Sequence, residues 1–291
     1  MEEVIINGKA LYTPKGAARE YAAVGCNYYT GCPHNCEYCY LKRGAPSKQL
    51  GGTEVKLKKC FKDWMDAMRI CEREMDKHLE YLQKVGIFLS FTSDPLIKET
   101  LHLTYSTVFY ALKNRDIPVI LLTKDSKFVL EGSEFWCIPT WLAKEKRQKL
   151  AVGFTLTGHD EMEAGADTNA SRIEAMKYIK ESRWGYSTWS SIEPIIDFDA
   201  SLEMIRQAVR YCDHFRIGLR SGVKKDYYKY DELCTFIKNV YSVFTDAERE
   251  YGVHPTVYWK DSITDRVNRL KLEPGMDRFT VGMDFMPFMR P

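Results

Sequence analysis

Short, unbroken apolar segments alternate with amphipathic segments along most of this 291-residue chain. Apolar runs of four to eight residues are typical of buried strands, whereas apolar residues at every third or fourth position are typical of helices. Six apolar runs lie at 22–29, 86–91, 118–123, 150–156, 186–192 and 215–219. Continuous apolar strands that alternate with helices form parallel sheets covered by helices. The sequence therefore predicts an α/β fold with a sheet of six parallel strands.

The segments between these strands carry the helical pattern. We expect helices at 61–85, 101–114, 133–147, 170–182, 201–211 and 231–250, with Pro139 interrupting the third. A late strand at 256–260 and a tail at 278–286 follow. Turn signals at Asn7-Gly8 and Pro14 predict a cap or an extended arm at the N-terminus. We expect an N-terminal extension at 1–21, a core at 22–220, and a C-terminal helical extension at 221–291 with the late strand, packed on the core.

The pattern alone leaves two arrangements of the parallel sheet open. One is an open, doubly wound sheet, and the other is a closed or partial barrel. Dinucleotide-binding sheets of the first kind carry a Gly-x-Gly-x-x-Gly motif at the first strand–helix turn. The sequence lacks that motif there, which weakens the dinucleotide-binding interpretation.

Charge and composition exclude several classes of protein. The formal net charge is +2, so the chain as a whole offers no electrostatic argument for nucleic-acid binding. No apolar run approaches the roughly 18 residues of a membrane-spanning helix, and the first residues do not resemble a signal peptide. We therefore expect a soluble, cytoplasmic protein without membrane contact. In that reducing compartment its nine cysteines stay free of disulfide bonds.

Polar residues follow five successive predicted strands. In parallel α/β folds the loops at the carboxyl ends of the strands converge, and ligands bind there. The strand-end residues that follow the second to fifth strands are Thr92, Ser93, Asp94, Lys124, Thr155, Thr157 and Glu193. Each has a structural alternative as well, because Ser and Asp also cap helices and a lysine after a strand can simply be solvated.

The first predicted strand leads directly into three closely spaced cysteines. Cys32, Cys36 and Cys39 are separated by three and two residues within the segment GCNYYTGCPHNCEYCY. Cysteine thiolates are the usual ligands of [4Fe–4S] clusters, and three of them leave the fourth iron open to another ligand. A structural zinc ion is the alternative, but it requires four ligands, with Cys26 or His34 as the fourth. The remaining cysteines, Cys60, Cys71, Cys137, Cys212 and Cys234, mostly fall in helical patterns and are expected to be small buried hydrophobes.

The motif Cys-x3-Cys-x2-Cys with an aromatic residue before the last cysteine resembles the signature loop of radical S-adenosylmethionine enzymes. The resemblance implies a partial (β/α)6 barrel with the cluster loop after its first strand. It also implies a [4Fe–4S] cluster held by Cys32, Cys36 and Cys39, and S-adenosylmethionine as cofactor. Reductive cleavage of that cofactor would give a 5′-deoxyadenosyl radical that abstracts hydrogen from a substrate. The electron would come from a reductant such as flavodoxin or ferredoxin.

Further segments narrow the resemblance to the photoproduct-lyase-like branch of this family. They are PKGAAREYAAVGCNYYTGCPHNCEYCYLK, LSFTSDP, LLTKDS and SIEP, and the similarity covers about 12–219. The resemblance implies that Tyr38 lies by the adenine and that Tyr40 relays the radical. It implies cofactor contacts from Ser93, Lys124 and Thr155, to which we add Asp94 and Glu193 from the strand ends. Lys124 would neutralise the methionine carboxylate as a point charge.

One departure from the lyase pattern bears on the substrate. The lyase carries a hydrogen-donating cysteine at the end of its second strand, where this chain has Phe91 or Thr92. Neither side chain gives up a hydrogen atom as a thiol does, so we do not expect repair of the spore photoproduct. The branch assignment stands, but the substrate and the hydrogen donor stay open, as does the oligomeric state.

Two basic stretches keep nucleic acid among the candidate partners. Residues 223–230 interleave lysines with tyrosines, a combination used for phosphate contact and base stacking. Lys56, Lys58, Lys59 and Lys62 form the second stretch. Both are also compatible with solvated surface segments. The alternative function is therefore a metal-stabilised nucleic-acid-binding module without catalysis, which would contain zinc and bind no S-adenosylmethionine.

Overall fold

The computed structural model describes residues 4–44, 47–129, 144–182, 184–224, 226–267, 272 and 274–283. Eight strands of this part of the chain form one sheet, in the order β1-β2-β5-β6-β7-β8-β9-β10. They are β1 (Leu11–Tyr12), β2 (Gly25–Cys26), β5 (Ile87–Leu89), β6 (Val119–Thr123), β7 (Leu150–Thr155), β8 (Ser187–Ile195), β9 (His214–Leu219) and β10 (Thr256–Trp259). Only β1 is antiparallel to its neighbour. The predicted α/β fold with a mostly parallel sheet is confirmed, and the sheet is open.

The two ends of the parallel sheet differ from the prediction. The first strand is only two residues long, because Asn27 leaves the sheet: its side chain accepts a hydrogen bond from Phe91 N (2.9 Å) and donates one to Tyr12 Oη (2.9 Å). Residues Tyr29–Thr30 then form β3, which pairs with β4 (Lys56–Leu57) in a separate small sheet. At the other end, β10 pairs with β9 and adds a seventh parallel strand to the predicted six.

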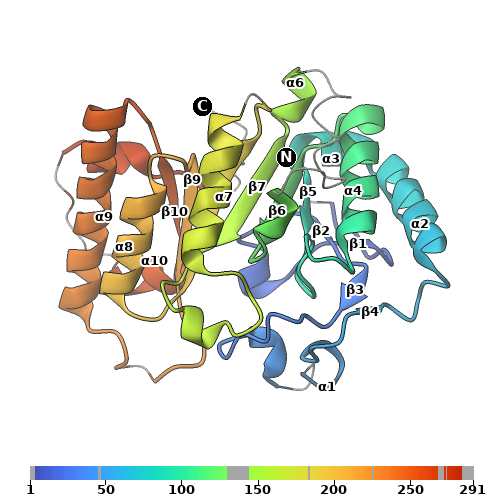
Figure 1. Ribbon diagram of the computed structural model, residues 1–291, viewed down its shortest axis with the longest axis horizontal. Helices are drawn as coiled ribbons and strands as arrows, with labels where there is room; N and C mark the ends of the chain where they lie inside the picture. Colours follow the sequence, from blue (N-terminus) through green and yellow to red (C-terminus); the bar gives the residue numbers. More distant parts are fainter. Residues whose placement is uncertain are drawn as a thin grey trace.

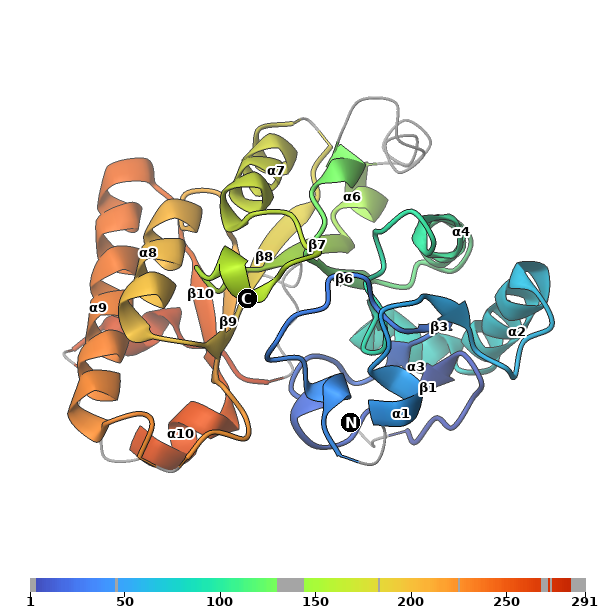
Figure 2. The same ribbon diagram turned by 60° about the horizontal axis from the view of Figure 1, so that its bottom comes forward.

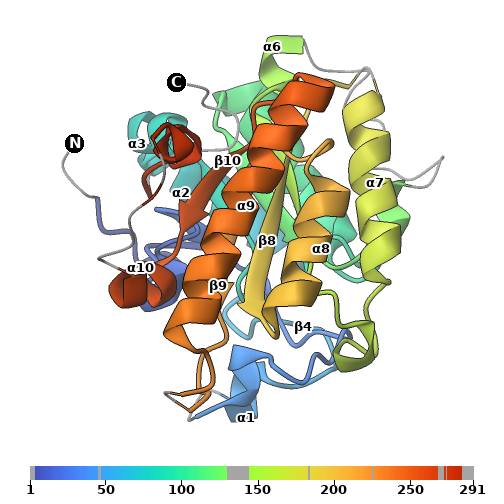
Figure 3. The ribbon, with the colours of Figure 1, turned by 90° about the vertical axis from the view of Figure 1, so that its left-hand side faces the viewer.

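Helices cover the outer face of the sheet (Figures 1 and 2). They are α2 (Trp64–Lys77), α3 (Leu79–Val85), α4 (Leu101–Phe109) with a π-helical continuation η3 (Tyr110–Arg115), α7 (Asn169–Glu181), α8 (Phe198–Ala208) and α9 (Tyr230–Tyr251). The shorter helices are α1 (Ser47–Leu50), α6 (Lys144–Arg147) and α10 (Asp261–Val267). Figure 3 shows α7, α8 and α9 side by side over β8 and β9. No helix of the described part combines the length and apolar character needed to span a membrane.

One helix prediction is wrong in part, and another falls largely outside the described residues. The single helix expected at 61–85 is broken at His78, whose backbone (φ −116°, ψ 23°) is not helical. The break starts a second helix, which buries Leu82 and ends at Gly86, whose positive φ of 69° turns the chain into β5. Of the helix expected at 133–147 only α6 lies in the described part of the chain, and Cys137 lies outside it.

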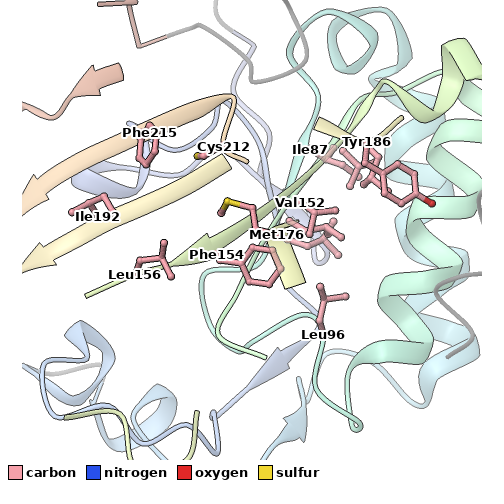
Figure 4. Close-up of a cluster of buried hydrophobic side chains, with 14 of the residues drawn as sticks. Ile87, Leu96, Val152, Phe154, Leu156, Met176, Tyr186, Ile192, Cys212 and Phe215 are labelled. Carbon is pink, nitrogen blue, oxygen red and sulfur yellow. The ribbon is translucent and has the colours of Figure 1, made fainter. Parts of the chain in front are cut away.

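Alternate strand residues enter two separate apolar clusters. The larger lies between the sheet and the helices and includes Val152, Phe154 and Met176 (Figure 4). The smaller consists of Ala22, Phe88, Ile120, Ala151 and Trp189. Since successive side chains of a strand point to opposite faces, the smaller cluster lies on the inner face. The strands are therefore buried on both faces, which explains why they are apolar throughout.

Candidate functional site

A cavity of about 460 Å³ opens where the carboxyl ends of the parallel strands meet. Its volume falls in the range of roughly 300–1,000 Å³ that is usual for small-molecule sites. The lining includes the three cysteines and most of the polar residues that the sequence predicted for the site: Cys32, Cys36, Cys39, Tyr38, Tyr40, Ser93, Asp94, Lys124, Thr155 and Glu193. Two further strand-end residues, Thr92 and Thr157, are not part of the lining. Inner-face residues such as Phe88 and Leu122 form apolar parts of the wall. The structure thus brings the predicted residues together around one space.

The three cysteines lie on the tight segment between β3 and the short 3-10 helix η2 (Tyr40–Lys42). Gly31 starts this segment with a φ of 85°, and a Cβ there would overlap the carbonyl of Glu54, so the position requires glycine. Asn35, between the first two cysteines, also has a positive φ of 51°. These two backbone turns hold the three thiols on one short loop at the cavity wall.

In the described part of the chain, the cysteine loop does not form a preformed single-ion site. Within the described residues, no group of three or more His, Cys, Asp or Glu side chains converges as a single-ion site would require. Each thiolate of a cubane binds a different iron, so the three sulfurs need not converge on one point. Burial raises the pKa of the Cys32 thiol to about 12 and also raises that of Cys36. In the metal-free protein both thiols are therefore protonated at neutral pH, and binding of a metal would displace their protons.

Neither candidate for a fourth zinc ligand is available to the loop. The sulfur of Cys26 lies 3.9 Å from that of Cys71, and both residues are fully buried in the outer core. His34 uses both ring nitrogens: Nε2 lies 2.9 Å from Asp94 Oδ2, and Nδ1 lies 3.0 Å from the Gly165 carbonyl. Because a carbonyl only accepts, Nδ1 carries a proton and donates.

Asp94 connects the cysteine loop to two strands. Besides His34, it accepts hydrogen bonds from Thr123 Oγ1 (2.7 Å), Lys124 N (2.8 Å) and Leu96 N (2.9 Å). Burial alone would raise the pKa of this carboxyl, but His34 and the backbone donors outweigh burial and lower it. Burial would lower the pKa of His34, and Asp94 reverses that effect and raises it. The pair is a buried ion pair, and Asp94, which we expected at the cofactor, has its acceptor capacity filled by protein donors.

Tyr38 is fixed by a second buried ion pair that the sequence did not reveal. Its hydroxyl donates to Glu163, which also pairs with Arg172 Nη2 at 2.5 Å. The same guanidinium donates to the carbonyls of Thr155 (2.7 Å) and Asp167 (2.6 Å). Arg172 belongs to α7 and is fully buried, because its guanidinium reaches the end of β7 at Thr155.

The polar groups predicted for the cofactor differ in how far they are already paired. The Ser93 hydroxyl is buried and finds no hydrogen-bond partner in the described part of the chain. The ammonium group of Lys124 lies 5.5 Å from the centre of the Tyr38 ring, at the cavity. Thr155 is buried at the end of β7. Tyr40 is 55% exposed, and its hydroxyl donates to the Phe91 carbonyl.

The opposite wall carries a charged cluster that includes Glu193 and Lys260. The sequence indicated Glu193 as a strand-end residue, and it indicated Lys260, at the end of the late strand, as a residue that either lines a substrate pocket or closes the barrel. Oε2 of Glu193 accepts from Lys260 Nζ (2.7 Å) and from the Tyr21 hydroxyl, which also lies 2.7 Å from Ser191 Oγ. Lys260, 1% exposed, lies in the cavity lining and is 3.4 Å from Glu20 Oε2. Tyr21 and Glu20 lie in the N-terminal arm, whose sequence gives no signal of a role in the site.

The two basic stretches have different environments. In 223–230, Tyr228 is buried and donates to the Ile195 carbonyl (2.5 Å), whereas Tyr227 and Tyr230 are 46% and 49% exposed. In the other stretch, Lys58 Nζ donates to the Lys9 carbonyl (2.5 Å), and Lys56 pairs with Glu54 at 2.7 Å. In the stretch of Lys56 to Lys62, Lys58 thus holds the N-terminal arm in place, and the charge of Lys56 is partly neutralised by Glu54.

Comparison with known proteins gives little beyond this geometry. No family model matches the sequence, and no curated protein matches it. Among solved structures, the chain is similar to Streptococcus suis SuiB bound to S-adenosylmethionine, with a TM-score of 0.47 and 13% identity. The match covers 82% of this chain and 50% of the SuiB chain. The chain thus spans half the length of that protein, and a likeness this distant does not identify what the chain binds.

Proposed function

We propose that this protein is a radical S-adenosylmethionine enzyme of the photoproduct-lyase-like branch. The observation that carries the proposal is the shared cavity: three cysteines of one loop and polar residues from four other strand ends line it together. With a cluster bound there, reductive cleavage of S-adenosylmethionine would supply a radical that takes hydrogen from a substrate. The open sheet would then be the partial (β/α)6 barrel of this family. Nucleic acid stays a candidate substrate, and flavodoxin or ferredoxin a candidate reductant.

The residues around the cavity have distinct tasks under this proposal. Cys32, Cys36 and Cys39 hold the cluster. The unpaired hydroxyl of Ser93 is free to bind the amino group or a hydroxyl of the cofactor, and Lys124 meets its carboxylate.

Tyr38 offers a ring face whose direction is set by Glu163 and Arg172. Thr155 and the second oxygen of Glu193 complete the polar contacts of the cofactor. Asp94 acts indirectly, since it positions the cysteine loop against β5 and β6.

Electron paramagnetic resonance of the anaerobically reconstituted and reduced protein tests this proposal. We expect a [4Fe–4S]⁺ signal that changes when S-adenosylmethionine is added, because the cofactor occupies the open iron. Replacement of any one cysteine, as in Cys36→Ala, should abolish cluster incorporation, whereas Cys60→Ala should leave the iron content unchanged because Cys60 lies outside the cavity lining. A protein that binds zinc, or a cluster signal indifferent to S-adenosylmethionine, would refute the proposal in favour of a structural metal site.

A further inference from the structure

The cavity carries more positive charge than S-adenosylmethionine requires. Its lining includes five Lys and Arg side chains, Lys15, Lys42, Lys124, Arg220 and Lys260, and two carboxylates, Asp94 and Glu193. Asp94 is paired with His34, and Glu193 with Lys260. In the described part of the chain, no acidic side chain pairs with any of the other four cations. This excess is local, because the whole chain has a net charge of only +2.

The cofactor does not account for this excess. S-adenosylmethionine carries a sulfonium and an ammonium group but only one carboxylate, so its own net charge is positive. A [4Fe–4S] cluster with three thiolate ligands would be anionic, and the positive charge of the cofactor would largely offset that negative charge. Lys124 is sufficient for that carboxylate. The remaining three cations would repel the cofactor unless a second, anionic ligand were bound beside it.

Two of the cations, Lys42 and Arg220, lie on neighbouring segments of the cavity wall. Arg220 directly follows β9, and Lys42 ends the short helix after the cysteine loop. These two segments touch, because Arg43 Nη1 donates to the Ser221 carbonyl. A Cβ at Gly222 would overlap the same guanidinium, so this close approach depends on glycine. The contact brings Lys42 and Arg220 to the same side of the opening.

Arg220 shows most directly that a partner is missing. Its Nε is buried and has no hydrogen-bond partner among the residues that the structure describes. A buried donor of a charged group is costly to leave unpaired, and the planar guanidinium fits phosphate oxygens with two parallel hydrogen bonds. Lys42, by contrast, already binds the Asn35 carbonyl at 3.0 Å. Lys42 would therefore attract an anionic ligand mainly through its charge and less through a new hydrogen bond.

We propose that Arg220, Lys42 and Lys15 form a subsite for a phosphate group of the substrate. This inference rests on the proposed function and adds the chemical class of the second ligand. Three cations suit a phosphate dianion better than a carboxylate, which carries one charge. Under the proposed function the cofactor and the substrate would share the 460 Å³ cavity, and the phosphate would anchor the substrate beside the cofactor.

Titration calorimetry of the full chain with inorganic pyrophosphate, at constant ionic strength, tests the subsite. Arg220→Gln should weaken binding by about tenfold, because it removes a charge-assisted donor pair. Arg220→Lys should restore part of the affinity. Lys84→Gln, an equal change of charge at an exposed site on α3 outside the cavity lining, should have no effect. Circular dichroism confirms that each variant is folded.

A single-stranded oligonucleotide of ten residues distinguishes the source of the phosphate. The affinity for the oligonucleotide is measured at several salt concentrations. If the oligonucleotide binds, and if its affinity depends less steeply on salt in Arg220→Gln than in the unchanged protein, the ligand is a nucleic-acid backbone. If Arg220→Gln weakens the binding of pyrophosphate but not that of the oligonucleotide, the ligand is a small phosphorylated molecule. The subsite does not exist if the Arg220→Gln and Lys84→Gln proteins bind both probes equally well. Because the titrations are run on both cluster-loaded and metal-free protein, this result is independent of whether the cluster and S-adenosylmethionine bind.

Discussion

At the scale of single residues, the site depends on side chains that support others. Asp94 accepts hydrogen bonds from four protein groups and so joins the cysteine loop to the ends of β5 and β6. Arg172 has the same relation to Tyr38 through Glu163. Sequence reasoning found the residues that face the cavity, because strand ends and cysteine spacing are local signals. It considered His34 as a zinc ligand, because the partner of His34, Asp94, is 60 positions away. It missed Arg172, because Arg172 acts through Glu163 on Tyr38, and these two residues are 125 positions apart.

Replacement of Asp94 should therefore destabilise the folded protein. Asp94→Ala leaves His34 buried without its counter-charge and two backbone donors without an acceptor, so we expect a loss of about 3–5 kcal/mol in the free energy of unfolding. Urea denaturation of the metal-free protein measures this loss. Asp76→Ala is the matched control, because it removes an ion pair with Arg115 at the surface, where such pairs contribute about 0–1 kcal/mol. Equal losses in the two variants would contradict the ion-pair interpretation.

At the scale of elements, the inner face of the sheet is shaped to leave room for the cavity. Gly153 in β7 lies under the indole ring of Trp189 from the adjacent strand β8. The ring nitrogen of Trp189 donates to the Leu121 carbonyl of β6 at 3.0 Å. Tyr21 packs against this tryptophan, with ring centroids 6.2 Å apart. The glycine thus lets one large side chain link three strands beneath the site.

Gly153→Ala should disturb this arrangement. A Cβ at this position would overlap the Trp189 ring, so the indole must shift and lose its bond to β6. We expect a loss of about 1–3 kcal/mol in the free energy of unfolding, together with a changed near-ultraviolet circular dichroism spectrum. Gly282→Ala, where a Cβ meets open space, should change neither quantity. An unchanged tryptophan signal in Gly153→Ala would show that the ring does not depend on the glycine.

At the scale of the whole molecule, the alternating pattern was sufficient for the fold class but not for the ends of the sheet. Buried parallel strands are recognisable because both faces are apolar. The short length of β2 was not predicted, since it is set by the side chain of Asn27. The strand β10 was expected as the late strand at 256–260, but the pattern did not show that it pairs with β9 as a seventh parallel strand. The N-terminal arm was likewise expected only as an extension. In the structure it reaches the cavity through Tyr21 and joins β8 and β10 through charged side chains.

The link between the arm and the far end of the sheet depends on Lys260. Its ammonium group lies 2.7 Å from Glu193 of β8 and 3.4 Å from Glu20 of the arm. Lys260→Met keeps most of the side-chain volume but leaves two carboxylates without a cation, so we expect a loss of about 3–5 kcal/mol in the free energy of unfolding. Lys149→Met, which breaks a surface pair with Asp116, should lose no more than about 1 kcal/mol.

A double variant shows whether the charge or the packing of Lys260 matters. If the unpaired charge causes the loss, adding Glu193→Gln to Lys260→Met should recover part of the stability, because one of the two carboxylates is then neutral. The coupling between the two substitutions should reach about 0.5–3 kcal/mol, as expected for residues in contact. Hydrogen exchange should also accelerate at 17–21 in Lys260→Met, because the arm loses its contact with the sheet. If the two substitutions were additive and the arm stayed protected, then packing alone would hold the arm against the open edge of the sheet.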